Sequence, residues 1–83
     1  MKTIRYLPLA RKALRRHRTE TERIRRKIAA YATDPAAQAD NVKRLKGRRS
    51  TLRLRVGDFR VLFIENDEGI LVIDIGPRGS IYD

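Results

Sequence analysis

Apolar and polar side chains alternate along the stretch from Arg53 to Phe63, which reads RLRVGDFRVLF. This alternation predicts two β-strands, Thr51 to Val56 and Phe59 to Ile64, because successive side chains of a strand point to opposite faces of a sheet. The Gly57-Asp58 pair between them is typical of a two-residue hairpin turn, in which glycine adopts a positive φ. A third strand, Ile70 to Ile75, is almost continuously apolar, which indicates a strand covered on much of both faces.

The first part of the chain has a helical period instead. A short strand is expected at Lys2 to Leu7, and Pro8 then suits the first turn of a helix. Basic residues crowd one side of this helix, and His17 and Arg18 lie near its end, where positive charge is favourable. The apolar residues that recur with helical spacing on the other side are Leu9, Ala10, Ala13 and Leu14.

A second helix is predicted after Thr19 and Glu22, whose spacing matches a capping box. Its apolar stripe, at positions i, i+4 and i+7, consists of Ile24, Ile28 and Tyr31. Asp34 to Asn41, DPAAQADN, is predicted to be a loop because it holds an Asp-Pro pair and many polar residues. Val42 to Gly47 is expected to form a turn or a short irregular connection.

The order of elements is therefore one strand, two helices and a three-strand meander. This order predicts an α+β fold in which both helices pack on one face of the sheet. The 83 residues suit a single domain, residues 1–83, and nothing in them indicates a repeat or a second domain. A domain of this size buries a modest fraction of its surface, so its stability is expected to be marginal.

A two-residue loop at Gly57-Asp58 fixes which residues of the hairpin face each other. Three of the resulting pairs are entirely apolar and form the face best suited to pack against the helices. The apolar agreement supports this register, since a slip of one residue would turn every side chain to the opposite face. The three pairs are Val56 with Phe59, Leu54 with Val61, and Leu52 with Phe63.

The opposite face of the hairpin carries Arg53, Arg55 and Arg60. Arg55 lies opposite Arg60 in this register, and like charges that face each other across a strand pair repel. One explanation is structural: the stem of Arg60 stacks on Leu62, and carboxylates neutralise the cluster. The other is that the face binds an anion such as a phosphodiester, which accepts bidentate bonds from arginine. Arg78, which follows the apolar strand, can then approach the edge of the cluster. The candidate carboxylates are Glu65, Asp74 and Asp83.

The chain as a whole is strongly basic, with a net charge of +10 and a sequence pI near 11.1. Residues 1–60 hold nineteen basic and five acidic side chains, a net charge of +14. Residues 61–83 hold one basic and five acidic side chains, a net charge of −4. Such an excess favours binding to nucleic acid, to an acidic protein, or to both. Fifteen of the twenty basic residues are arginine, whose planar fork matches phosphate and carboxylate groups.

The composition also excludes several classes of site. The absence of cysteine and the single histidine, His17, exclude disulfides, thiolate sites and histidine clusters, so neither a metal nor a cofactor is expected. The longest apolar run, Gly69 to Ile75, is too short to span a membrane. The N-terminal sequence lacks the apolar core of a signal peptide. A cytoplasmic protein without membrane contact is therefore expected.

Three segments that follow two basic helices resemble the RelE/ParE toxin superfamily of bacterial type II toxin–antitoxin systems: VKRLKG, LRLRVGDFRVLF and VIDIGPRGSIYD. The resemblance covers nearly the whole chain, and RLRVGDFRV and IGPRGSIY are its specific part. It implies a small RelE-like fold, in which an N-terminal strand and two helices pack on a mainly antiparallel sheet. It also implies a cognate antitoxin as partner and a toxin–antitoxin hetero-oligomer.

Within the superfamily, the chain resembles RelE-like members most. These are endoribonucleases that cut messenger RNA on the ribosome without a metal, by attack of the 2′-hydroxyl on the adjacent phosphate. The resemblance therefore implies an mRNA interferase whose partners are messenger RNA and the ribosome. ParE-like members share the fold, lack most of the catalytic set and inhibit DNA gyrase by binding to it, which is the alternative function.

The resemblance implies four catalytic residues. Arg53 matches a basic residue of the family's catalytic strand, and Arg60 matches the arginine placed against the scissile phosphate. Arg78 matches the arginine that stabilises charge or protonates the leaving 5′-oxygen. Tyr82 matches the tyrosine that stacks on a base or aids proton transfer.

Three further residues, Arg55, Lys43 and Lys46, are expected to bind RNA. Thr51 stands where some RelE-like members have a second lysine, and Pro77 where many have lysine or histidine. Because arginine stays protonated, stabilisation of the phosphorane by positive charge should dominate over proton transfer. We expect the sheet arginines to be exposed, so removing one should change the folding stability by only about half a kcal/mol.

Overall fold

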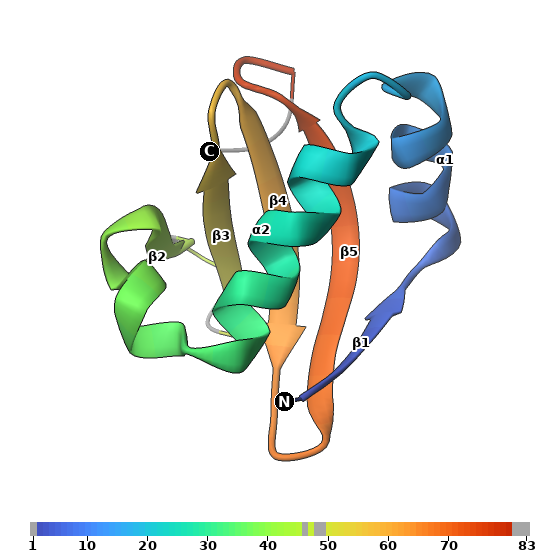
Figure 1. Cartoon of the computed structure of the whole chain (residues 1–83). Coiled ribbons are helices and arrows are strands. Elements are labelled where there is room, and N and C mark those ends of the chain that lie inside the picture. Colours follow the sequence, from blue (N-terminus) through green and yellow to red (C-terminus); the bar gives the residue numbers. More distant parts are fainter. Residues whose placement is uncertain (1, 46, 48–49, 81–83) are drawn as a thin grey trace.

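A computed structural model describes residues 2–45, 47 and 50–80 of the chain. These residues form an α+β fold in which two α-helices lie on one face of a mixed sheet (Figure 1), as the sequence predicted. The elements follow the chain in the order β1 (Thr3–Tyr6), α1 (Pro8–Arg16), α2 (Thr21–Thr33), the 3₁₀ helix η1 (Pro35–Asn41), β2 (Val42–Arg44), β3 (Thr51–Val56), β4 (Phe59–Glu65) and β5 (Gly69–Pro77).

The described strands form one sheet in the order β1-β5-β4-β3-β2. The neighbours from β5 to β2 pair antiparallel, whereas β1 returns from the other end of the chain and pairs parallel with β5. The parallel pair needs a close approach, because a Cβ atom on Gly69 would lie 2.2 Å from the carbonyl oxygen of Thr3. The strand β5 therefore lies inside the sheet. Its apolar sequence fits the core residues Ile70, Val72 and Ile75 and the packing of Ile73 against Leu45 and Leu62.

The register of the β3–β4 hairpin is the predicted one. Val56 pairs with Phe59 across the turn, and the alternation continues to the pair Leu52 and Phe63. The apolar face of this hairpin forms the sheet side of the main core, and both helices pack against it. The largest side chains that are fully buried in this core are Phe63, Ile24, Ile28, Leu54, Val61 and Val72.

The α1–α2 corner differs from the predicted capping box. The residue before α2 is Glu20, one residue later than Thr19, and the structure shows no side-chain hydrogen bond at this cap. The hydroxyl of Thr21 instead donates to the carbonyl oxygen of Leu14 at 2.6 Å and contacts that of His17 at 3.2 Å. The threonine at this corner thus ties the start of α2 to the end of α1, because it satisfies carbonyls that α1 leaves open.

Two predictions for the segment after α2 are wrong. The expected loop is a 3₁₀ helix, η1, which begins at Pro35 and is capped by Asp34, whose side chain accepts a hydrogen bond from the N–H of Ala37 at 3.4 Å. The expected irregular connection contains β2, a strand of three residues that pairs with the free edge of β3. Such a short strand depends on pairing with β3, which its local sequence does not reveal.

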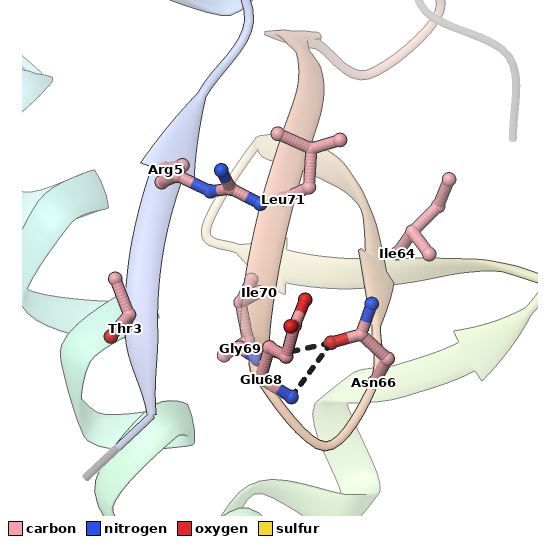
Figure 2. A pocket seen from close by; sticks show the side chains of 8 residues that line it. All are labelled: Thr3, Arg5, Ile64, Asn66, Glu68, Gly69, Ile70 and Leu71. Carbon is pink, nitrogen blue, oxygen red and sulfur yellow. Dashed lines mark hydrogen bonds between the residues drawn. The ribbon is translucent and has the colours of Figure 1, made fainter.

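The turn between β4 and β5 lies where the sequence ENDEG predicted it. The side-chain oxygen of Asn66 accepts hydrogen bonds from the N–H groups of Glu68, at 2.8 Å, and Gly69, at 3.1 Å (Figure 2). An asparagine in this role fixes the turn by replacing a backbone acceptor. Lys2 secures the start of β1 beside this turn by donating to the carbonyl oxygen of Asn66 at 3.1 Å.

The face of the sheet opposite the helices has a small apolar cluster of its own. Leu45 and Leu62 are buried there, with Ile73 packed against them. The pairing of β4 with β5 shifts between Leu62 and Phe63, whose partners are Asp74 and Val72. The shift leaves Ile73 as an extra residue of a β-bulge, and bulges redirect side chains in this way.

Candidate nucleic-acid interface

The sheet brings the three hairpin arginines together on the face that the helices leave open, called here the arginine face. Arg53 and Arg55 come from β3 and Arg60 from β4, with Arg55 directly opposite Arg60. Lys43 on β2 is the partner of Arg53 on the other side, so the cationic row continues to the edge of the sheet. The predicted arrangement of these arginines is therefore confirmed.

Arg60 differs from the expected exposed arginine, because only 6% of its surface is accessible. One of its terminal nitrogens donates to the backbone oxygens of Gly57, at 3.2 Å, and Phe59, at 3.1 Å. Across the sheet its partner on β5 is Gly76, which has no side chain to occupy that face. The carbonyl oxygens of Gly57 and Phe59 thus hold the guanidinium in one position.

Arg78 lies at the same end of the sheet as the Arg55–Arg60 pair. Its backbone N–H donates to the carbonyl oxygen of Asp58 at 2.6 Å, which fixes the residue beside the hairpin turn. The side chain of Arg78 is exposed. The structure therefore brings Arg78 close to Arg60 in the fold, as the sequence predicted from its place just after β5.

Two of the three carboxylates that might have neutralised this cluster have other hydrogen-bond partners. Glu65 forms an ion pair with Lys2 at 2.8 Å and accepts a hydrogen bond from the hydroxyl of Tyr31 at 2.5 Å. Asp74 accepts a hydrogen bond from the backbone N–H of Ile75 at 2.8 Å. Asp83 lies outside the described residues. The structural explanation is therefore wrong for Glu65, whose partners are Lys2, just before β1, and Tyr31 on α2.

Arg55 has a partner that sequence reasoning missed. Its guanidinium donates to the side-chain oxygen of Asn41 at 3.2 Å, and Asn41 lies at the end of η1. The contact arises because β2 places Asn41 just beyond the pair Val42 and Leu54. With β2 unrecognised, nothing in the sequence indicated this neighbour.

The other predicted site residues divide into two groups. Arg53 is half-buried, and Lys43 beside it is exposed. Tyr82 and Lys46 lie outside the described residues, and their roles stay predictions. His17 is a helix-end residue as expected, since it caps α1 and packs its ring edge-on against Phe59 with the centroids 5.0 Å apart.

The titratable groups with shifted pKa values are Tyr6 and Tyr31, which pack in or against the main core, and Glu65, which is bonded to Tyr31. Burial raises the pKa of Tyr31, and its hydrogen bond to Glu65 raises it further. Burial acts to raise the pKa of Glu65 too, but hydrogen bonds from Lys2 and Tyr31 and the charge of Lys2 outweigh it, so this pKa is lowered. Burial also raises the pKa of Tyr6, opposed by Arg25, whose guanidinium lies 4.7 Å from the ring centroid.

The arginine face can therefore stabilise negative charge, and its described arginines cannot act as proton acceptors at ordinary pH. Among residues 2–45, 47 and 50–80, no three His, Cys, Asp or Glu side chains lie close enough to hold a metal ion. Neither α1 nor α2 has the length and apolarity of a membrane-spanning segment.

A family model for the ParE toxin of the parDE type II toxin–antitoxin system matches residues 4–82. The chain belongs to this toxin family. The resemblance to the RelE/ParE superfamily is thereby confirmed. No curated protein sequence matches this ParE-family toxin.

Solved structures of related toxins have the same fold as this ParE-family toxin. The archaeal RelE–RelB complex from Pyrococcus horikoshii OT3 matches with a TM-score of 0.74 and 23% identity, over 96% of this chain and 98% of that one. The RelB–RelE complex from Methanococcus jannaschii matches with a TM-score of 0.71 and 24% identity, over 95% of both chains. The Escherichia coli DinJ–YafQ complex matches with a TM-score of 0.77 and 12% identity, over 99% of this chain and 98% of that one. At these identities the likeness shows the fold alone.

Proposed function

We propose that this toxin is a metal-independent endoribonuclease that cuts messenger RNA on the ribosome. The observation that carries the proposal is that the backbone positions of Arg55, Arg60 and Arg78 lie together at one end of the sheet. Positive charges that lie near one another repel, and a phosphodiester relieves such repulsion by accepting charge-assisted hydrogen bonds.

The reaction begins when the 2′-hydroxyl of the target nucleotide attacks the adjacent phosphorus. A bond forms between the 2′-oxygen and phosphorus, the bond to the 5′-oxygen breaks, and the 2′-proton passes to the leaving 5′-oxygen directly or through water. The products are a cyclic 2′,3′-phosphate and a free 5′-hydroxyl. Negative charge grows on the phosphoryl oxygens in the transition state, and fixed donors directed at that charge accelerate the reaction.

Each arginine has a distinct part in this proposal. Arg60 is held by the turn carbonyls and supplies a preorganised charge beside Gly76. Arg78, exposed at the same end, binds the scissile phosphate or the leaving oxygen. Arg53 and Lys43 bind the neighbouring backbone, and Tyr82 stacks on a base. The ribosome supplies the orientation of the message.

The partner in the cell is a cognate antitoxin, with which the toxin forms a hetero-oligomer. The relatives named above were solved as complexes of toxin and antitoxin. The basic surface of this chain, +14 over residues 1–60, fits an antitoxin segment rich in acidic residues.

A second candidate is an inhibitor that binds DNA gyrase and cuts nothing. The family match to the ParE toxin favours it, as does the burial of Arg60, which leaves little of that side chain for a substrate. The convergence of exposed Arg55 and Arg78 beside Arg60 favours the nuclease.

Induction of the toxin without an antitoxin separates the two candidates. Incorporation of labelled amino acids and the length of messenger RNAs report on translation, and chromosome breaks report on gyrase. The nuclease proposal expects truncated messages and arrested protein synthesis with intact chromosomes. Broken chromosomes with full-length messages would overturn it in favour of gyrase inhibition.

A further inference from the structure

A groove between α2 and η1 adjoins the arginine face at the end of β3. It has a volume of 370 Å³, and Val56 and Gly57 form part of its lining. In Figure 1, η1 leads from the end of α2 to β2 at the edge of the sheet. The cationic side chains that line the groove are Arg23, Arg26, Lys27 and Arg55.

Two of these cations form ion pairs with glutamates in or just before α2. Arg23 forms an ion pair with Glu20, and Arg26 forms one with Glu22 at 2.7 Å. Neither Lys27 nor Arg55 forms an ion pair with another described residue. An anionic group between the side chains of Lys27 and Arg55 would therefore gain charge-assisted hydrogen bonds that the protein itself does not supply.

The other wall of the groove carries two carboxamides in a hydrogen-bonded series. Arg55 donates to Asn41 at 3.2 Å, and the amide nitrogen of Asn41 donates to the side-chain oxygen of Gln38 at 3.1 Å. The amide nitrogen of Gln38 has no partner among the described residues. A half-buried carboxamide with free donor capacity suits the edge of a nucleobase, which offers paired donors and acceptors.

Arg55 connects this groove to the arginine face. Its backbone is the direct partner of Arg60, while its side chain lines the groove and contacts Asn41. A polynucleotide whose phosphate lies at Arg60 can therefore continue past Arg55 around the sheet edge. The Cα atoms of Arg55 and Arg60 are about 5 Å apart, as are those of other directly opposite residues in an antiparallel pair.

We propose that this groove binds the nucleotide adjacent to the scissile phosphate, with Lys27 and Arg55 on its phosphate and Gln38 on the edge of its base. The proposal rests on the proposed nuclease function and assigns Gln38 as a residue that selects the base. The volume lies within the range of pockets that hold small ligands. An acidic peptide would satisfy the cations, but it has no base edge to use the Gln38 carboxamide.

Two variants test the groove, Lys27→Ala and Gln38→Ala, with Lys12→Ala on α1 as the matched control. Binding of a labelled hexaribonucleotide with 2′-methoxy sugars, which cannot be cut, is measured by fluorescence anisotropy at several salt concentrations. Lys27→Ala is expected to weaken binding and to lower the slope of log affinity against log salt by about 0.7, one phosphate contact. Lys12→Ala is expected to bind like the wild type.

Cut sites on ribosome-bound messages are mapped for the same proteins. Gln38→Ala is expected to lose about tenfold of the wild-type preference for the base beside the cut, since a good base contact discriminates by about that factor or more. Base preference and affinity that stay at wild-type values in both variants would overturn the proposal.

Two further outcomes are also decisive. A hexaglutamate peptide that displaces the hexaribonucleotide and binds more tightly, in a manner that depends on Lys27, would overturn the nucleotide site and assign the groove to an acidic protein. A wild-type chain that cuts no message would overturn the nuclease function, whereas the anisotropy measurement reports on RNA binding in the groove by itself.

Discussion

At the scale of single residues, the arginines of the site fall into two kinds. Arg60 is buried and bonded to the carbonyls of the hairpin turn, so it contributes to the fold as well as to the charge of the face. Arg78 is exposed, and its fixed contact with Asp58 is made by the backbone. Substitution of the two residues should therefore separate stability from activity.

Arg78→Ala should lower the cleavage rate on the ribosome by about 10²–10³, because it removes a donor directed at developing charge. Its free energy of unfolding should change by no more than about half a kcal/mol, as for other surface substitutions. Urea unfolding and single-turnover cleavage measure the two quantities. Arg5→Ala is the control, since Arg5 is an exposed arginine on β1, where it pairs with Leu71 far from the hairpin turn. An equal loss of rate in both variants would contradict a specific role for Arg78.

Arg60→Ala should lower the free energy of unfolding by about 1–3 kcal/mol, because the charge-assisted hydrogen bonds of the guanidinium to the carbonyl oxygens of Gly57 and Phe59 are lost. This expected loss is larger than the change of about half a kcal/mol predicted from the sequence for an exposed arginine. The same urea titration measures it. A variant as stable as the wild type would show that the two carbonyl contacts contribute nothing to the fold.

Glu65 makes the free energy of unfolding depend on pH. Its folded-state pKa lies below its unfolded value, so its contribution to stability is present above the unfolded pKa and is lost as the pH falls through the folded pKa. Glu65→Gln should therefore lower the unfolding free energy at pH 7 and differ less from the wild type at pH 3. Urea titrations at the two pH values measure this. A difference in unfolding free energy between Glu65→Gln and the wild type that is larger at pH 3 than at pH 7 would contradict a lowered pKa for Glu65.

At the scale of elements, the hairpin that carries the arginines depends on its turn. Gly57 has a φ of +58°, and a Cβ atom there would lie 3.0 Å from the guanidinium of Arg23. Gly57→Ala should lower the unfolding free energy by about 1–2 kcal/mol, the cost of a left-handed conformation for an ordinary residue. Gly57→Asn should lower the unfolding free energy by less than Gly57→Ala does, because asparagine tolerates this conformation. Urea unfolding compares the two, and equal losses would assign the cost to the contact with Arg23 instead.

The β3–β4 hairpin could be predicted from the sequence because each of its residues fits one register. The period of two, the glycine turn and the apolar pairs indicated the same arrangement, so the arginines were placed on the correct face. β2 could not be predicted in this way, since three residues have too little local preference and depend on pairing with β3. The contact of Arg55 with Asn41 was missed for the same reason.

The burial of Arg60 was missed for a different reason. Alternation along a strand gives the face of a side chain but not its accessibility, which also depends on contacts such as those of the Arg60 guanidinium with the carbonyl oxygens of Gly57 and Phe59. The bulge at Ile73, which adds to that cluster, has no glycine or proline to mark it in the sequence.

At the scale of the whole molecule, the uneven charge should govern association with the antitoxin. Residues 1–60 carry a net charge of +14, and opposite charge accelerates encounter when it is not screened. The association rate measured by stopped flow should fall steeply between 50 and 500 mM salt, because screening shortens the reach of the field. The dissociation rate should change less. An association rate independent of salt would contradict an electrostatic encounter.

The central claim is that the arginine face stabilises a phosphate attacked by its own 2′-hydroxyl. The most direct measurement uses a ribosome programmed with an end-labelled message that carries either a ribose or a 2′-deoxyribose at the cut nucleotide. We expect the wild-type toxin to cut only the ribose message and to leave a cyclic or 3′-phosphate end, because the deoxy sugar lacks the nucleophile. We expect the Arg60→Ala, Arg78→Ala double variant to cut neither message. Cutting of the 2′-deoxy message, or undiminished cutting by the folded double variant, would contradict the account.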